Sequence, residues 1–221
     1  MNLFPFPLLP RESQRVFSLE QSAENGCDHA LSGRIGWTRE PLNQVQVATQ
    51  AITAQLLEAQ GAHDTRVLRG SDRAPQWPQG FVGSISHSQR LGAVAVLPQT
   101  AARSVGIDVE RELDADQQWL VRKYCLVENE LDALVARSLS LSETQILTLC
   151  FSAKEAVFKC LYPLVKHYFD FTSVRLVAMH ESTNLVLVEV LDEQIARCAG
   201  VSALSGSFRF TEGHAFTAFR L

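Results

Sequence analysis

Short segments that either alternate between apolar and polar residues or run continuously apolar predict three β-hairpins along the chain. A strand with the alternating pattern places every second side chain on a buried face, and a short polar or glycine-containing segment reverses its direction. The predicted turns fall at residues 88–90, at residues 180–184 and at Glu212-Gly213. The six predicted strands cover residues 81–87, 91–97, 174–179, 185–191, 207–211 and 214–220. We therefore expect antiparallel sheet in both halves of the sequence.

Apolar residues that recur every three to four positions predict the helices between these strands. A first helix is expected within residues 41–60, with Gly61 as its stop, and a second over residues 119–134,. A third begins at the capping sequence of residues 140–143 and should stop or kink at Pro163,. The buried face of this third helix would carry Cys150, Ala153, Val157, Leu161 and Leu164.

A long helix accompanied by antiparallel strands occurs in both halves of the sequence. This succession of elements is typical of the α+β class, in which helices pack on a mostly antiparallel sheet. We expect two α+β halves, residues 1–105 and residues 106–221.

The segment Ser104-Val-Gly-Ile-Asp-Val-Glu110 carries two carboxylates that would lie on one face of a strand. Because side chains alternate faces in an extended strand, Asp108 and Glu110 point to one side and Val109 to the other. Two like charges this close repel each other, and a bound cation relieves the repulsion. Gly106 would let another backbone or a ligand approach. By itself, however, Asp-x-Glu at a strand end is more often a solvated turn than a metal site.

Residues 151–162 form an amphipathic helix in which Glu155 and Lys159 lie one turn apart,. On a solvated surface such a pair contributes only roughly a few tenths of a kcal/mol. Here large apolar residues surround the pair, namely Phe151, Phe158 and Tyr162. A third carboxylate on a rigid helix is what an oxygen-ligated divalent ion requires, so Glu155 is a candidate to join the two strand carboxylates.

Composition and charge narrow the class of protein. The chain has 221 residues, of which 46% are hydrophobic, and a net charge of −4, which leaves no basic face for a nucleic-acid backbone,. Its five cysteines are scattered without a C-x-x-C pair, which argues against a disulfide framework or a zinc site and for a reducing compartment,. Residues 1–10 are apolar but contain three prolines and no basic region, so we expect a surface tail rather than a signal or membrane-spanning segment,. A cytoplasmic protein is the expectation.

Three motifs follow one another along the middle of the chain. They are Gly83-Ser-Ile-Ser-His-Ser88, Gly106-Ile-Asp-Val-Glu110 and Phe151-Ser-Ala-Lys-Glu-Ala-Val-Phe-Lys159. The flanking segments Arg69-Gly70, Arg73-Ala-Pro-Gln-Trp-Pro78, Leu161-Tyr-Pro-Leu164 and Tyr168-Phe-Asp-Phe171 accompany them. In this order and at these spacings, the chain resembles the 4′-phosphopantetheinyl transferases of the surfactin and enterobactin type over residues 66–171.

The resemblance implies two pseudo-symmetric α+β halves with a ligand cleft between them. It implies an enzyme that moves the 4′-phosphopantetheine arm of coenzyme A to a serine of an apo carrier protein and releases adenosine 3′,5′-bisphosphate. The carrier would belong to a peptide-synthetase, polyketide or siderophore pathway. Mg²⁺, or Mn²⁺ in its place, would be the cofactor and coenzyme A the substrate. The implied partners are acyl or peptidyl carrier domains, without nucleic acid or membrane, and the expected form is a monomer.

The resemblance also assigns roles to individual residues. The expected metal ligands are Asp108, Glu110 and Glu155, and the expected catalytic residues are Glu155, as the base, and Lys159. The expected coenzyme A contacts are Arg69, Gly70, Arg73, Ser86, His87, Lys154 and Lys159. A surface for docking the carrier protein is expected at Trp119, Tyr124, Leu126 and Glu130.

The chain departs from the resemblance in its first helix. Where relatives carry an arginine for the 3′-phosphate of coenzyme A, residues 41–60 offer glutamines. Either Arg34 or Arg39 would substitute, or the 3′-phosphate would be held less tightly. Two other classes of function stay open. One is a non-catalytic module that binds coenzyme A or carrier proteins, and the other is a Mg²⁺-dependent hydrolase of pyrophosphates, in which water replaces the serine.

Overall fold

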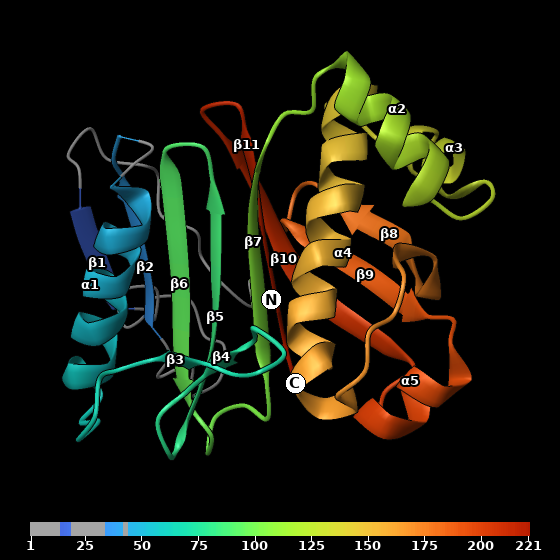
Figure 1. The fold of residues 1–221 in the computed structure, drawn as a ribbon. Helices are drawn as coiled ribbons and strands as arrows, with labels where there is room; N and C mark the ends of the chain where they lie inside the picture. The colour runs from blue at the N-terminus through green and yellow to red at the C-terminus, as the bar shows by residue number, and fades with distance from the viewer. Residues whose placement is uncertain (1–13, 19–33, 42–43) are drawn as a thin grey trace.

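The computed structural model describes residues 14–18, 34–41 and 44–221. Within them, two antiparallel sheets lie next to each other, and helices pack on both (Figure 1). This mixture of helices and antiparallel sheets confirms the α+β class. The expected N-terminal surface tail, residues 1–10, lies outside the described residues. No helix in the described part of the chain combines the length and the apolar character needed to cross a membrane.

The first sheet has four strands in the order β1-β2-β6-β5, and helix α1 packs against it. Ile52 and Leu56 of the helix lie against Val94 and Val96 of β6 in a small core of their own. A two-stranded hairpin, β3-β4, follows α1. The elements of this half are β1 (Gln14–Ser18), β2 (Arg34–Arg39), α1 (Val45–Ala59), β3 (Leu68–Arg69), β4 (Pro75–Gln76), β5 (Phe81–Ser88) and β6 (Leu91–Pro98).

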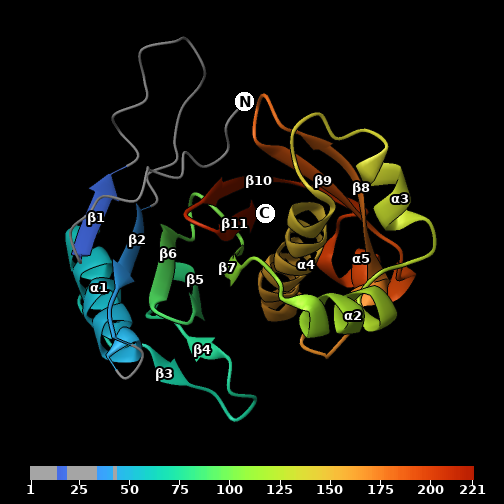
Figure 2. The ribbon, with the colours of Figure 1, turned by 90° about the horizontal axis from the view of Figure 1, so that it is seen from above.

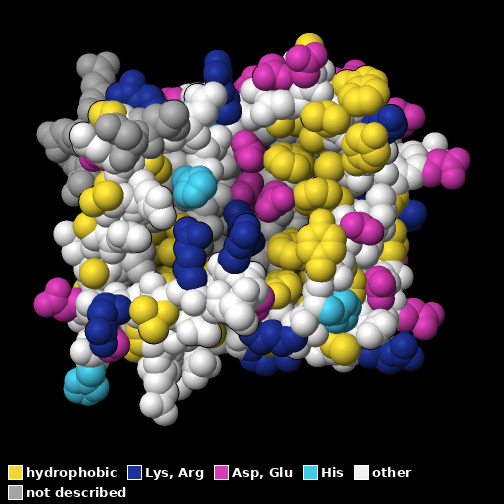
Figure 3. All heavy atoms as spheres, in the orientation of Figure 1, with side chains coloured by type: hydrophobic (Ala, Val, Ile, Leu, Met, Phe, Trp, Pro, Cys, Tyr) yellow, Lys and Arg dark blue, Asp and Glu magenta, His cyan; other side chains and the backbone are white. Residues whose placement is uncertain are grey.

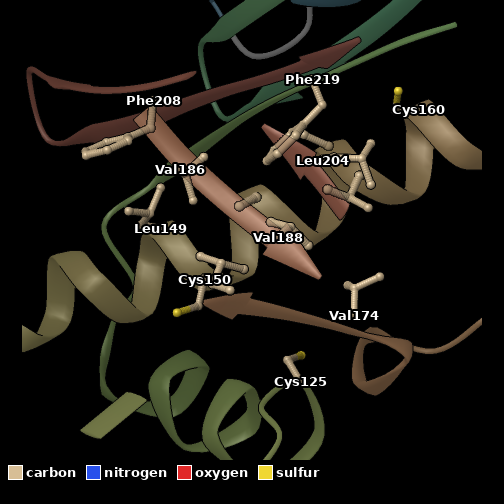
Figure 4. Close-up of a cluster of buried hydrophobic side chains, with 14 of the residues drawn as sticks. Cys125, Leu149, Cys150, Cys160, Val174, Val186, Val188, Leu204, Phe208 and Phe219 are labelled. Atoms are coloured by element: carbon tan, nitrogen blue, oxygen red, sulfur yellow. The ribbon is translucent and has the colours of Figure 1, made fainter. Parts of the chain in front are cut away.

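The second sheet has five strands in the order β7-β11-β10-β9-β8, and the long helix α4 packs against it. The largest core lies between them and includes Leu149, Cys150, Val188 and Phe219 (Figure 4). Figure 2 shows α1 at one side of the molecule and α4 at the other, with β6, β5 and β7 between them. The elements are β7 (Val105–Arg111), α2 (Ala115–Tyr124), α3 (Glu130–Val135), α4 (Glu143–Val165), η2 (Phe171–Ser173), β8 (Val174–His180), β9 (Leu185–Val190), α5 (Glu193–Ala199), β10 (Ala203–Thr211) and β11 (His214–Arg220).

Helix α4 crosses strand β7 at Gly106, where a side chain would not fit. An added Cβ at this position would lie 1.9 Å from the carbonyl oxygen of Ala156 and 2.5 Å from the amide nitrogen of Cys160. The neighbouring Ser104 donates from Oγ to the carbonyl of Cys160 at 2.5 Å. The prediction that Gly106 permits a close backbone approach is confirmed, and the approaching backbone is that of the helix with the third predicted carboxylate.

The two sheets are joined by hydroxyl groups as well as by a shared apolar core. Strand β5 presents three buried serines to the edge of β7, and their Oγ atoms accept hydrogen bonds from backbone N–H groups. The pairs are Ser84 with Ile107 at 3.0 Å, Ser86 with Val109 at 3.3 Å and Ser88 with Arg111 at 3.2 Å. We call these three contacts the serine ladder. They satisfy donors that the edge of β7 would otherwise leave unpaired, and residue numbers rise together along them, so the two strands run in the same direction.

A fully buried ion pair holds α3 against α4. The side chains of Lys154 and Glu130 are wholly inaccessible, and Nζ lies 2.8 Å from Oε2. The ammonium also donates to three backbone carbonyls, and the carboxylate accepts from two backbone N–H groups. These backbone partners replace the water that both charges lose on burial, which is what makes such a pair tolerable in a core.

The hairpins and the first helix agree with the sequence prediction, since all six predicted strands are present and α1 lies within residues 41–60. The prediction of one helix over residues 119–134 is wrong, because the chain breaks there into α2 and α3. Lys154 holds the carbonyl of Cys125 just after α2, and Asn129 starts α3 from a left-handed conformation with φ 60°.

Two further differences concern helix ends and a missed helix. Helix α4 does not stop at Pro163 but continues to Val165, because Val165 packs in the core and its burial favours a last turn that extends past the proline. Helix α5, between β9 and β10, was not predicted, although Asp192 caps its N-terminus by accepting from the N–H groups of Gln194 and Ile195. Its seven residues are too few to display a helical period clearly,.

Replacing Ser84 by alanine is expected to destabilise the junction between the sheets. The buried N–H of Ile107 would lose its acceptor, which typically costs about 1–3 kcal/mol. Denaturant titration should therefore show a lower free energy of unfolding. Ser205→Ala, on an exposed position of β10, is the matched control and should change stability by less than about 0.5 kcal/mol. Equal stabilities of the two variants would contradict a structural role for the serine ladder.

Replacing Lys154 by methionine is expected to lower the free energy of unfolding by about 3–5 kcal/mol, because Glu130 would be left as an unpaired buried charge. Adding Glu130→Gln to this variant should recover part of the loss, since no net charge then remains in the core. Thermal unfolding monitored by circular dichroism measures both effects. The control Lys123→Met alters an exposed lysine and should melt close to the wild type. Indistinguishable melting of the two lysine variants would refute the pair's contribution.

Candidate active site

Asp108 is the centre of a hydrogen-bonded group where β5, β7 and α4 meet. Its side chain is buried, and its Oδ1 accepts hydrogen bonds from Lys159 Nζ and Ser86 Oγ, both at 2.7 Å. Lys159 Nζ also donates to Ser86 Oγ at 3.1 Å. The other oxygen, Oδ2, is buried and has no hydrogen-bond partner among the residues that the structure describes. A buried carboxylate oxygen without a donor is costly, and a bound cation would relieve that cost.

Glu110 lies two residues further along β7, so its side chain shares a face with that of Asp108,. Ser88 donates to its Oε2 at 3.3 Å. The pKa of the Glu110 carboxyl is raised to about 7, first by burial and then by the negative charge of Asp108. Glu155 adds a smaller increase, whereas the hydrogen bond from Ser88 and the charge of Lys159 act in the opposite direction. The Glu110 carboxyl therefore changes its protonation state near pH 7.

Glu155 projects from α4 one helical turn before Lys159. Burial raises the pKa of its carboxyl, the positive charge of Lys159 lowers it, and the negative charge of Asp108 raises it. Carboxylates from a strand and from a helix, far apart in the sequence, thus act on one another electrostatically. The ammonium of Lys159 pairs with Asp108, and its positive charge partly offsets the pKa increases of Glu110 and Glu155.

The described part of the chain contains no cluster of three or more His, Cys, Asp or Glu side chains arranged to hold a metal ion. The carboxylates at the junction still have the chemistry of a site for a hard divalent cation. Their oxygens are ligands that Mg²⁺ prefers, and burial, followed by the negative charge of Asp108, raises the pKa of Glu110 and Glu155,. Lys159 donates to Oδ1 of Asp108, and Oδ2, which no described residue contacts by a hydrogen bond, remains available as a metal ligand.

The surface around the group carries charge and apolar side chains next to each other. In the space-filling view, acidic and basic side chains gather at the centre of the face where β5, β7 and α4 meet (Figure 3). A band of hydrophobic side chains adjoins them over α2 and α4. Trp119 and Tyr124 of α2 are exposed, and Lys123 Nζ lies 4.7 Å and 5.0 Å from their ring centroids. Leu126, which was predicted with them, is only partly buried and packs against the core.

The predicted coenzyme A contacts come from several elements. Ser86 is buried in the Asp108 group, whereas His87, the next residue, is exposed near the end of β5. Arg69 and Arg73 are exposed on the β3-β4 hairpin, and Gly70 lies in its turn. The structure therefore brings Ser86 and Lys159 together with the carboxylates and keeps the arginines on a separate hairpin of the first half.

Two predicted site residues lie in the core instead. Lys154, expected to contact coenzyme A, and Glu130, expected to contact a carrier protein, form the buried ion pair of α3 and α4. Adjacent residues of a helix point about 100° apart, so Lys154 faces the core while Glu155 faces the sheet junction. Neither side chain of the pair reaches the surface, and both assignments are corrected.

The prediction that Arg34 or Arg39 replaces the missing helix arginine as a contact of the 3′-phosphate is also not confirmed. Arg39 forms an ion pair with Glu212 of the β10-β11 turn. The side chain of Arg34 lies outside the described part of the structure.

Sequence reasoning missed two sets of contacts. The serine ladder had a signal, because serines at every second position, as at 84, 86 and 88, place one polar row on an otherwise apolar strand,. The second is a hydrogen bond from Tyr162 Oη to Asp72 Oδ2 at 3.0 Å. These two residues are 90 positions apart in the chain, and no local pattern links them.

Comparison with known proteins gives matches in both halves. The 4'-phosphopantetheinyl transferase superfamily matches residues 104–217, and the 4'-phosphopantetheinyl transferase N-terminal domain matches residues 47–97. The first match includes the carboxylates of the junction together with Lys159, and the second includes Ser86 and the β3-β4 hairpin.

Individual relatives are similar over part of their length. The chain is 38% identical over 111 residues to 4'-phosphopantetheinyl transferase Svp of Streptomyces mobaraensis, covering 50% of this chain and 44% of the relative. It is 31% identical over 127 residues to 4'-phosphopantetheinyl transferase PptT of Mycobacterium tuberculosis, covering 58% and 54%. It is 37% identical over 90 residues to enterobactin synthase component D of Salmonella typhi, covering 41% and 36%.

The matched segments thus span about half, or less, of the length of these relatives. The superfamily match is longer in relation to this chain, because residues 104–217 make up just over half of its 221 residues. On that match, and with the junction carboxylates and Lys159 inside it, the chain belongs to the 4'-phosphopantetheinyl transferase superfamily.

Proposed function

We propose that this chain transfers the 4′-phosphopantetheine arm of coenzyme A to a serine of an apo carrier protein and releases adenosine 3′,5′-bisphosphate. The observation that carries the proposal is the Asp108–Lys159 pair at the sheet junction, whose two charges act on the neighbouring carboxyls of Glu110 and Glu155. The family membership supports it, because these four residues lie inside the superfamily match.

The substrate would be held mainly by positive charge, because coenzyme A carries a pyrophosphate and a 3′-phosphate. Lys159 lies at the junction, and Arg69 and Arg73 are exposed on the β3-β4 hairpin. Arginine suits phosphate because its planar guanidinium donates two parallel hydrogen bonds. His87 near the end of β5, together with the turn at Gly70, would complete the contacts.

Asp108, Glu110 and Glu155 would hold one Mg²⁺, or Mn²⁺ in its place. When bound, the ion would neutralise the negative charge of the pyrophosphate and of the carboxylates themselves. The Oδ2 atom of Asp108, which has no hydrogen-bond partner among the described residues, supports this assignment. The pKa of Glu110 also supports it, because burial and the negative charge of Asp108 raise this pKa to about 7.

The reaction would break the phosphoanhydride bond of coenzyme A and form a phosphoester bond to the serine of the carrier. The serine oxygen of the carrier attacks the phosphorus atom that bears the pantetheine arm, and the bond from this atom to the bridging oxygen of the pyrophosphate breaks. That oxygen leaves with adenosine 3′,5′-bisphosphate. The hydroxyl proton passes to Glu155, directly or through a water molecule, and Lys159 stabilises the negative charge that develops on the phosphate oxygens.

Two roles of Glu155 compete with each other. Burial raises the pKa of this carboxyl, which makes it a better acceptor for the serine proton,. Ligation of a divalent ion lowers the pKa of a carboxyl, so Glu155 serves either as a base or as a metal ligand at a given moment.

A carrier protein would dock beside α2, where Trp119 and Tyr124 expose their rings and where the partly buried Leu126 follows shortly after the helix. Exposed aromatic side chains next to a site are typical anchors of interfaces. In this proposal residues 1–105 supply most coenzyme A contacts, and residues 106–221 supply the metal ligands and the catalytic residues. A cytoplasmic monomer would be the working form.

Mass spectrometry of an apo carrier protein tests the proposed reaction. After incubation with coenzyme A, Mg²⁺ and the wild-type protein, the carrier should gain one phosphopantetheine group. Asp108→Asn should slow this modification by roughly 100-fold or more, because it removes a charge that orders both Lys159 and the ion. Asp132→Asn, at an exposed position of α3, is the control and should react like the wild type. Release of nucleotide with an unmodified carrier would instead identify a hydrolase, and no reaction at all would leave only a binding module.

The pH dependence of metal binding gives an independent test. A proton on Glu110, whose pKa is about 7, competes with Mg²⁺ for the carboxylate, so the apparent affinity should fall as the pH drops from 8 to 6. Below the pKa the loss approaches about tenfold per pH unit. Calorimetric titration of Mg²⁺ in the presence of coenzyme A at pH 6, 7 and 8 measures it. Glu110→Gln should flatten the dependence, and a wild-type affinity that is constant with pH would contradict this role of Glu110.

A further inference from the structure

A hydrogen bond connects the β3-β4 hairpin to helix α4. Tyr162 Oη donates to Asp72 Oδ2 at 3.0 Å, across 90 positions of the chain. Asp72 lies in the turn of the hairpin, in the first half of the molecule, and Tyr162 lies near the C-terminal end of α4, in the second. Figure 1 shows the turn of this hairpin reaching across β5 and β7 toward the lower part of α4.

Asp72 also shapes the turn from which it extends. Its other oxygen, Oδ1, accepts a hydrogen bond from the N–H of Ala74 at 3.0 Å. The N–H groups of Gly70 and Arg73 donate to the carbonyls of Ala74 and Gly70, both at 2.9 Å. The carboxylate lies over Gly70, where an added Cβ would be 2.6 Å from Oδ1. One side chain therefore closes the turn with one oxygen and fastens it to α4 with the other.

The hairpin that Asp72 fastens carries two exposed arginines, Arg69 at the end of β3 and Arg73 in the turn. In the part of the chain that the structure describes, neither forms an ion pair with a carboxylate. Arg73 has φ 63°, a left-handed conformation that costs energy for a residue other than glycine and persists only where the surroundings hold it,. Its guanidinium is thus presented by a backbone that depends on the contacts of Asp72.

Tyr162 extends the functional face of α4. Positions 155, 159 and 162 follow the spacing i, i+4, i+7 of a single helix face, so Glu155, Lys159 and Tyr162 form one row,. Lys159 in this row pairs with Asp108. Fastening the hairpin at Tyr162 therefore places its arginines at the end of the row that contains the site.

We propose that Asp72 and Tyr162 are positioning residues that hold Arg69 and Arg73 next to the Asp108–Lys159 group, where the arginines bind phosphates of coenzyme A. This inference rests on the proposed function. Asp72 and Tyr162 do not themselves touch the reacting atoms. Loss of their contact should consequently weaken substrate binding and spare the chemical step, which distinguishes it from loss of a catalytic group.

Tyr162→Phe tests this with minimal change, because it removes the hydroxyl and keeps the ring, whose centroid lies 5.4 Å from that of Phe158. The Kd and the KM for coenzyme A should each rise about fivefold, the effect of one hydrogen bond, while kcat at saturating coenzyme A stays within about twofold of the wild type. Tyr168→Phe is the matched control, since this exposed tyrosine also packs on Phe158, at 5.5 Å, and lacks the contact with Asp72. It should bind coenzyme A like the wild type.

Asp72→Ala and the double variant complete the cycle, because alanine can neither donate to nor accept from Tyr162. If the two residues act through one bond, the double variant should bind coenzyme A no more weakly than Asp72→Ala alone. Unchanged melting temperatures would show that all variants are folded. Additive losses, a fall in kcat with constant KM, or wild-type affinity of Tyr162→Phe would each overturn the inference while the proposed function stands. Failure of the wild type itself to bind coenzyme A would instead remove the proposed function and this inference with it.

Discussion

The serine ladder between β5 and β7 is the contact on which the arrangement of the molecule depends. Strand β7 is an edge of the second sheet, and its outward N–H groups need acceptors once β5 covers them. Serine hydroxyls provide the acceptors in place of backbone carbonyls. Two of the three also donate to the site, Ser86 to Asp108 and Ser88 to Glu110. The groups that join the two halves of the chain therefore also orient the two strand carboxylates.

The electrostatics of the site follow from this placement. Asp108 is buried and keeps one oxygen without a partner in the described structure, and burial together with neighbouring negative charge raises the pKa of Glu110 and Glu155. Lys159 compensates only part of this charge. An arrangement of this kind is unfavourable for a purely structural cluster, but it suits a site that completes its charge balance with a cation and an anionic substrate.

Helix α4 separates structural from functional residues by face. Lys154 points into the core and pairs with Glu130, while Glu155, one position later, faces the sheet junction with Lys159. The close approach at Gly106 sets the distance between this helix and β7, and hence between the helix carboxylate and the strand carboxylates. A rigid helix seated on a strand without intervening side chains is a suitable support for a site that depends on charge placement.

The sequence by itself determined the local geometry of this protein. It predicted the hairpins, the common face of Asp108 and Glu110, and the single turn between Glu155 and Lys159, because the periods of strands and helices fix these relations within a few residues. Only the tertiary structure decided that Lys154 is buried, that α2 and α3 are separate, and that Tyr162 meets Asp72. Which face of a helix turns to the core, and which distant side chains then meet, depends on how whole elements pack, and no short stretch of sequence contains that information.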